Sequence, residues 1–151
     1  MAAIRSALRN LCGLEAEAVS VHDYVPGSVP GLVQTAMLQA EVTPFSTQEL
    51  ERRLQAGLTR QALLAQGDAP QYHAVIDEVA LHRRVGGPEV MRAQLQRIGQ
   101  SAQLPNVTAQ VIPSEAGAHP AIEKRFLYPR LRAGPSCQTL SMPRALSATS
   151  T

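Results

Sequence analysis

A short run of charged residues is the part of this sequence best suited to chemistry. Asp77 and Glu78 are consecutive, and His82, Arg83 and Arg84 follow shortly after them. Two carboxylates at the end of a strand can lie in the crevice where ligands bind to parallel sheets. Glu78 is therefore expected to form a salt bridge with Arg83 or Arg84 that fixes the turn or, as the alternative, to hold a cationic group of a ligand.

Two further positions carry polar side chains that a ligand could contact. Arg60 and Gln61 follow each other on a predicted helix, where a solvated helix face is the favoured interpretation. His119 precedes a proline in a pattern typical of a turn, although it could also present its imidazole to a pocket. The candidate ligand-binding residues are therefore Glu78, Arg83, Gln61 and His119.

The spacing of the other reactive side chains argues against a metal site and against catalysis. The four histidines and two cysteines form no His-x-x-x-His or Cys-x-x-Cys pattern, whereas a metal site needs three or four converging ligands. No Gly-x-Ser-x-Gly turn for a nucleophile occurs. Gly86-Gly87 lacks the lysine of a phosphate loop, and Pro88 removes a backbone donor there. We expect no catalytic residue, no metal, no cofactor and no enzyme activity.

Helical spacing of apolar residues predicts the elements that must position these side chains. The best-defined helix covers residues 46–66, because Ser46 and Glu49 match a capping box and Phe45 and Leu50 match a hydrophobic staple. Three other stretches show the same spacing. They cover residues 2–18, about 30–40 and 88–104.

Strands are predicted between these helices. Residues 72–77 and 107–112 are rich in β-branched residues, and 19–24 form a short strand or an extended link. Residues 78–81 either continue a strand or turn into a short helical piece. The helix between the two better strands favours a parallel crossover. The predicted fold class is α+β, or α/β, with a small mixed sheet on which amphipathic helices pack.

The composition excludes several classes of protein. Of the 151 residues, 44% are apolar and 17% are charged, unlike a disordered chain or a coiled coil. No run of about 18 apolar residues that could span a membrane occurs, and no apolar stretch of a secretory signal follows Met1. Cys12 and Cys137 are far apart, which fits free thiols in a reducing compartment. We expect a cytoplasmic protein without membrane contact.

Charge is distributed unevenly along the chain. Residues 1–123 hold nine Arg and twelve Asp or Glu, whereas residues 124–151 hold five Lys or Arg and no acid. The basic end lacks the interleaved aromatics of a nucleic-acid-binding segment, and Pro129 cuts its one apolar run. We therefore expect the end of the chain to be a basic, disordered tail without regular structure.

Seven short motifs occur in one characteristic order. They are LEAEA (14–18), VPGLVQT (29–35), RQALL (60–64), VIDEVAL (75–81), VGGPEVM (85–91), LPNVTAQVIP (104–113) and GAHP (117–120). With these motifs, which cover roughly residues 12–121, the chain resembles the DUF5753 domain. That domain follows the helix-turn-helix domain of many actinobacterial, XRE-type or antitoxin-like transcriptional regulators.

The resemblance implies a chain truncated at both ends. Family members carry a helix-turn-helix domain before this region and further strands after it. We expect an N-terminal helix remnant at 1–13, an effector or interaction domain at 14–121 and a divergent basic tail at 122–151. A shifted reading frame would produce such a change. The sheet is then expected to lack its last strands and to leave one edge open, which invites self-association.

The resemblance also implies a function. The chain is expected to be a ligand-sensing or protein-interaction domain of a helix-turn-helix-type regulator, without a DNA-binding module of its own. Its expected partners are a small-molecule effector or a partner protein, and a second copy in a homodimer. Sequence-specific nucleic-acid binding by this chain alone is not expected. The alternatives are an inactive, frame-altered remnant and, less favoured, a small enzyme.

Overall fold

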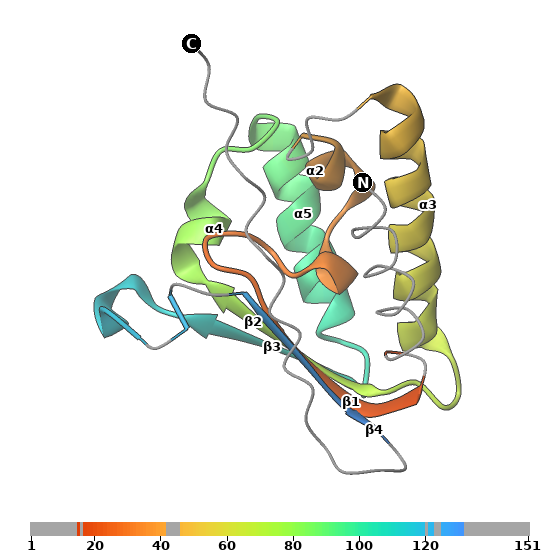
Figure 1. Ribbon diagram of the computed structural model, residues 1–151. Coiled ribbons are helices and arrows are strands. Elements are labelled where there is room, and N and C mark those ends of the chain that lie inside the picture. Colours follow the sequence, from red (N-terminus) through yellow and green to blue (C-terminus); the bar gives the residue numbers. More distant parts are fainter. Residues whose placement is uncertain (1–14, 16, 42–45, 120, 123–124, 132–151) are drawn as a thin grey trace.

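The described part of the protein combines a four-stranded mixed sheet with four α-helices. The computed structural model describes residues 15, 17–41, 46–119, 121–122 and 125–131. Within these residues, helices α3 and α5 lie together on one side of the sheet (Figure 1). The predicted fold class, a small mixed sheet with helices packed on it, is confirmed.

The sheet brings three parallel strands together with one antiparallel strand at its edge. Its order is β3-β2-β1-β4, with β1 and β3 both parallel to the central β2 and β4 antiparallel to β1. The parallel crossover predicted between the second and third strands is therefore present. The strands are β1 (Ala18–Tyr24), β2 (Gln71–Asp77), β3 (Val107–Ile112) and β4 (Phe126–Leu131).

The strand β4 corrects an expectation from the sequence. The segment after residue 121 was expected to hold no regular structure, yet Phe126–Leu131 pair with β1 along its length. Pro129, which suggested a break, lies opposite Val21. A proline is tolerated in an edge strand because its missing N–H group is not needed by a second neighbour. The sheet therefore crosses the boundary that was predicted at residue 121.

The helix α3 (Thr47–Ala62) continues into a 3₁₀ turn, η2 (Leu63–Ala65), close to the predicted limits of 46–66. Ser46 is the N-cap residue, but its hydroxyl makes no capping hydrogen bond. The Glu49 carboxylate instead pairs with Arg52 and Arg53 one turn further on. The capping-box prediction is therefore wrong in its hydrogen bonds, and the staple residue Phe45 lies outside the described residues.

The helix predicted near residues 30–40 is split in two. A 3₁₀ turn, η1 (Gly31–Val33), is followed by extended backbone at Gln34 and then by α2 (Ala36–Glu41). The buried Gln94 side chain explains the break, because its Oε1 accepts the Thr35 N–H at 2.7 Å and its Nε2 donates to the Val33 carbonyl at 2.8 Å. The Thr35 hydroxyl then accepts the Leu38 N–H.

The remaining helices follow β2. Residues 78–81 take the helical alternative, in α4 (Glu78–His82), and α5 (Pro88–Ser101) begins with Pro88 in its first turn, as predicted. Gly86 precedes α5 with φ of 64°, and a Cβ there would lie 2.6 Å from Cγ of Glu41. The helix predicted at 2–18 lies almost entirely outside the described residues.

The core lies between the helices and one face of the sheet. Alternate residues of β2 point into it, which matches the two-residue period of a strand. Polar side chains are also buried there, and these are described below. The buried apolar residues include Val21, Leu32, Val33, Leu64, Tyr72, Ala74, Ile76, Val90 and Met91.

Candidate functional site

A cavity of about 500 Å³ lies where the three parallel strands end. The chain segments that follow neighbouring parallel strands form the crevice in which such sheets bind ligands. The volume is in the range of small-molecule sites. We call this cavity the carboxyl-edge pocket. It is lined by Pro26 and Gly27 after β1, Asp77, Glu78 and Val79 at the end of β2, Ile112, Pro113 and Ser114 at the end of β3, and Gly117, His119 and Ile122 beyond.

Asp77, one of the lining residues of this pocket, is held in one orientation. Its Oδ2 accepts a 2.8 Å hydrogen bond from the Tyr24 hydroxyl and a 3.0 Å bond from the Gly27 N–H. Its Oδ1 faces Nε2 of His119 at 3.4 Å. The carboxylate is therefore fixed by two donors on one oxygen, while the other oxygen faces an imidazole.

Tyr24 joins the pocket to the edge strand β4. Its ring meets the His119 ring edge-on, with centroids 5.7 Å apart, and stacks on Phe126 at 5.3 Å. Burial, and then the hydrogen bond to Asp77, raise the pKa of Tyr24 well above its usual value. The phenol therefore stays a neutral donor to Asp77 across the ordinary pH range.

Glu78 is the second carboxylate of the pocket. Its Oε2 accepts the Ser114 N–H at 2.8 Å, and its Oε1 lies 3.7 Å from Nε2 of His82. Hydrogen bonds from the backbone and the side chain of Ser114 lower the pKa of Glu78, with a smaller contribution from His82. The salt bridge predicted to Arg83 or Arg84 is replaced, among the described residues, by these contacts with Ser114 and His82.

The structure brings together two of the four predicted ligand-binding residues. Glu78 and His119 both line the carboxyl-edge pocket. Arg83 is exposed and lies beside Gly27, where a Cβ would be 3.4 Å from the arginine Nη2, but it is not a lining residue. Gln61 lies elsewhere, on α3.

Gln61 has a structural contact set. Its Nε2 donates to the Gln34 carbonyl at 2.7 Å and weakly to the Gly31 carbonyl, and its Oε1 accepts from Arg97. These bonds attach α3 to the segment around η1 and to α5. The side chain therefore joins elements of the scaffold, and Gln61 is not among the residues that line the carboxyl-edge pocket.

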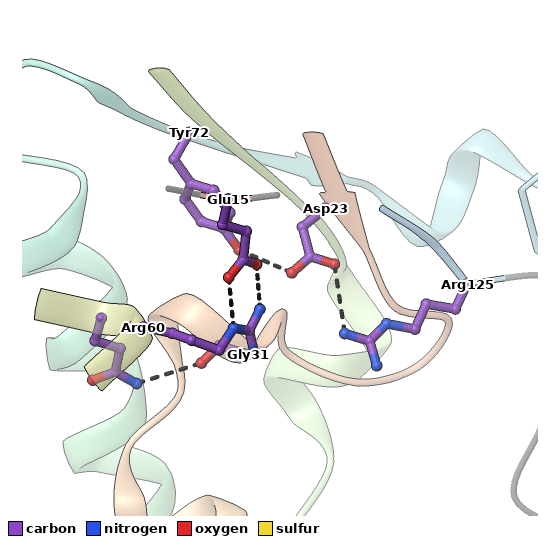
Figure 2. A network of polar contacts seen from close by, with 7 residues as sticks. Glu15, Asp23, Gly31, Arg60, Tyr72 and Arg125 are labelled. Carbon is purple, nitrogen blue, oxygen red and sulfur yellow. Dashed lines mark hydrogen bonds and ion pairs between the residues drawn. The ribbon is translucent and has the colours of Figure 1, made fainter. Parts of the chain in front are cut away.

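A buried polar network lies on the helix side of the sheet (Figure 2). The Arg60 guanidinium donates to both carboxylate oxygens of Glu15, from Nε at 2.7 Å and from Nη2 at 2.5 Å. The Arg60 side chain is 9% exposed and that of Glu15 is 1% exposed. The expectation that Arg60 lies on a solvated helix face is therefore wrong.

Asp23 is the second buried carboxylate of this network. Its Oδ2 accepts from the Tyr72 hydroxyl at 3.1 Å, and its Oδ1 lies 4.0 Å from Nη2 of Arg125. Among the described residues, neither Asp23 Oδ1 nor Arg125 Nε has a hydrogen-bond partner. Burial raises the pKa of Asp23, against the opposing charges of Arg125 and Arg60.

Charge coupling also acts on the other members of the network. Burial alone would lower the pKa of Arg60, but the hydrogen bonds and the charge of Glu15 outweigh it and raise that pKa. Burial, followed by the charge of Asp23, raises the pKa of Tyr72. The network therefore consists of the buried Arg60–Glu15 ion pair and, beside it, the Asp23 carboxyl group, whose charged form is disfavoured by burial.

Sequence reasoning missed several of these residues. Asp77 was recognised as one of two carboxylates at a strand end but was not among the four candidate ligand-binding residues, and Tyr24 was not considered as a site residue. The Arg60–Glu15 pair joins residues 45 positions apart, so no local spacing signals it. Residues 21 and 23 lie on the same side of a strand with a two-residue period, so the apolar Val21 was the available sign that the Asp23 carboxylate faces the core.

Other predicted absences concern metals and membranes. Across the described ranges, no three His, Cys, Asp or Glu side chains gather in a way that could hold a metal ion. Two histidines do come together, since His22 stacks on His73 across β1 and β2 with centroids 4.4 Å apart. In the part of the chain that the structure describes, no helix is both long and apolar enough to cross a bilayer.

Comparison with known proteins identifies the family. A family model described as "Domain of unknown function (DUF5753)" matches residues 8–145. The match extends past both ends of the 12–121 stretch that carries the resemblance, and it includes β4. No curated protein and no solved structure gives a significant match. Since the family model covers most of its length, this chain belongs to the DUF5753 family.

Proposed function

We propose that this chain is the ligand-sensing domain of a helix-turn-helix-type transcriptional regulator. The observation that carries the proposal is the carboxyl-edge pocket, which the ends of β1, β2 and β3 share. Small molecules bind at this place in sheets with parallel strands. The regulator context rests on the family resemblance alone. In a gel-shift assay on promoter DNA, this chain alone is expected to show no sequence-specific binding.

A sensing domain needs a route from the pocket to an interacting surface. Asp77 contacts His119 in the pocket and bonds to Tyr24, whose ring stacks on Phe126 of β4. Within the described residues, β4 has a strand neighbour only on its β1 side. A ligand that binds two arrangements of β4 with different affinities shifts their populations. We propose that a second copy of the chain or a partner protein pairs with the outer edge of β4.

A thermal-shift screen tests the sensing function. The full chain is heated with amino acids, amines, nucleosides, sugars and organic acids at millimolar concentration. A ligand present at 100 times its Kd stabilises the folded state by about 2.7 kcal/mol. Ile122→Trp places a larger side chain on the pocket wall, and Leu58→Trp makes the same kind of change at an equally exposed apolar position of α3.

The result should separate the two variants. At least one compound is expected to raise the Tm of the wild type and of Leu58→Trp but not that of Ile122→Trp. Hydrogen exchange of the β4 amides should change with the same compound, because Tyr24 joins the pocket to β4. The proposal fails when no compound stabilises the chain, or when Ile122→Trp responds as strongly as the wild type.

The remnant alternative concerns the end of the sheet. This alternative was based on the expectation that the strands after residue 120 are missing, whereas β4 is a strand in that region. A remnant without a stable fold would be digested throughout by a dilute protease. A working domain should leave a resistant core, and we expect that core to extend through β4.

The absence of enzyme activity stays a prediction, since Asp77 and His119 form a carboxylate–imidazole pair whose chemistry only an activity screen can test.

A further inference from the structure

The carboxylates of the carboxyl-edge pocket keep unused capacity to accept hydrogen bonds. One oxygen of each is engaged by short bonds, from Tyr24 and Gly27 to Asp77 and from Ser114 to Glu78. The other oxygens face histidine nitrogens at 3.4 and 3.7 Å, beyond the usual 2.7–3.2 Å of an N–H···O bond. An ionised carboxylate has about four acceptor positions, so each group can accept a further donor.

The electrostatic character of the pocket is acidic. Asp77 and Glu78 are consecutive in the sequence, and the described lining residues include no Lys or Arg, although Arg83 lies beside Gly27 at the margin of the pocket. The Ser114 bonds lower the pKa of Glu78, so that its carboxylate is ionised at neutral pH. An anionic ligand placed beside two carboxylates would be repelled, whereas a cation would be attracted.

The rest of the wall is apolar. Val79, Ile112 and Ile122 line the same cavity, and the residues Val79 and Ile122 are 48% and 52% exposed. Exposed apolar side chains around a few oriented polar groups are typical of small-molecule sites. A ligand that fits this wall carries an apolar body in addition to its charged end.

We infer that the carboxyl-edge pocket binds a small organic cation, with a primary ammonium group held between Asp77 and Glu78 and an apolar body against Ile112 and Ile122. This inference rests on the proposed sensing function and names the chemical class of its ligand. A primary ammonium offers three N–H donors, so it can donate to each of the two carboxylate oxygens that otherwise face only a histidine nitrogen. A bare divalent metal ion is a poorer fit, because the described residues gather no third ligand there and such ions take six or more oxygens.

Three probes of equal length test the charge requirement. The full, ¹⁵N-labelled chain is titrated at neutral pH with hexylammonium chloride, sodium hexanoate and 1-hexanol, and its amide spectrum is recorded. Hexylammonium is expected to shift the amides of Gly27, Ser114 and Gly117 to saturation. Hexanoate and hexanol should bind at least about tenfold more weakly, which corresponds to the loss of one charge-assisted hydrogen bond.

Matched variants test which residues hold the ammonium group. Glu78→Gln keeps an acceptor for the Ser114 N–H but removes the charge, and should weaken hexylammonium binding about fivefold or more. Asp77→Asn, which keeps one oxygen for Tyr24 and Gly27, should act in the same direction. Glu51→Gln removes one exposed charge on α3 and should leave the Kd within about twofold. The dispersion of each spectrum shows that the variant is folded.

The outcomes separate this inference from the proposed function. Equal binding of all three probes at the pocket amides would leave a sensing pocket but overturn the requirement for a cation. An equal Kd of Glu78→Gln and Glu51→Gln for hexylammonium would also overturn the requirement for a cation. Hexylammonium shifts confined to amides outside the pocket, or absent altogether, also contradict the inference. The compound screen on Ile122→Trp decides the sensing function independently of these results.

Discussion

The Tyr24 hydroxyl donates a 2.8 Å hydrogen bond to Oδ2 of Asp77, a residue 53 positions further along the chain. The two side chains come from β1 and β2, which are parallel neighbours in the sheet. Both are buried, and the Gly27 N–H shares the same carboxylate oxygen. The bond therefore fixes the carboxylate of the pocket relative to the strand that contacts β4.

Tyr24→Phe removes this bond and keeps the ring. The stacking on Phe126 is retained, so the loss measured is that of one buried, charge-assisted hydrogen bond, about 1.5–3 kcal/mol. Urea unfolding followed by circular dichroism should show a lower midpoint with an unchanged slope. When Asp77 is already replaced by Asn, Tyr24→Phe should lower the free energy of unfolding by less than it does in the wild type. An equal loss in both proteins would argue that Tyr24 and Asp77 are not energetically coupled.

Arg60→Met breaks the buried ion pair with Glu15. Removing one partner leaves a buried carboxylate without its counter-charge, which costs about 3–5 kcal/mol. Arg52→Met on the same helix is the matched control, because the Arg52 side chain is 51% exposed and its pair with Glu49 contributes less than about 1 kcal/mol. Thermal unfolding of both variants measures the difference. Similar Tm values for the two would contradict a supporting role of the buried pair.

Asp23→Asn should stabilise the fold at neutral pH. Because the pKa of Asp23 is raised on folding, the folded state binds its proton more tightly than the unfolded state. The stability of the wild type therefore falls as pH rises from the usual Asp value through the raised one, by about 1.4 kcal/mol for each pKa unit. In urea unfolding, Asp23→Asn should be more stable than the wild type at pH 7, and this difference should disappear near pH 4. A stabilisation that is independent of pH, or a loss of stability at pH 7, would contradict the raised pKa of the buried Asp23 carboxyl group.

Gln94→Leu tests the residue that splits the second predicted helix. It leaves the Thr35 N–H and the Val33 carbonyl without their partner, which costs about 2–6 kcal/mol for the two groups. Gln96→Leu makes the same change at an exposed position of α5 and should stay within about 0.5 kcal/mol. Chemical unfolding of the pair is the measurement, and equal stabilities would exclude a role for Gln94.

Local signals predicted the elements with strong periodicity. The helix α3, the helix α5 and the strands β2 and β3 lie close to their predicted limits, because each has an apolar face of the right period or a clear stop at a proline or glycine. The second helix could not be placed correctly from its own residues. Its break depends on Gln94, about 60 positions away, and a local pattern contains no such information.

The strand β4 and the pocket show a second limit of sequence reasoning. Pro129 argues against a strand only where both edges are paired, and nothing local indicates that β4 pairs on one side. Glu78 and His119 could be proposed because both are polar residues in or after a strand or turn. Asp77 was recognised as the second carboxylate at that strand end, but its neighbours Tyr24 and Gly27 became visible only once the parallel sheet placed three strand ends together.

The antiparallel pairing of β1 with β4 has a consequence for synthesis on the ribosome. β1 lies near the start of the chain, and its second neighbour is made about 100 residues later, since Tyr24 pairs with Phe126. While translation proceeds, β2 and β3 can pair on one side of β1, but the described strand that pairs with its other side is β4, which leaves the exit tunnel later. A nascent chain that pauses before β4 emerges therefore exposes unpaired backbone N–H and C=O groups of β1, with which other nascent chains can pair. Chaperone contact with β1 should end when β4 emerges.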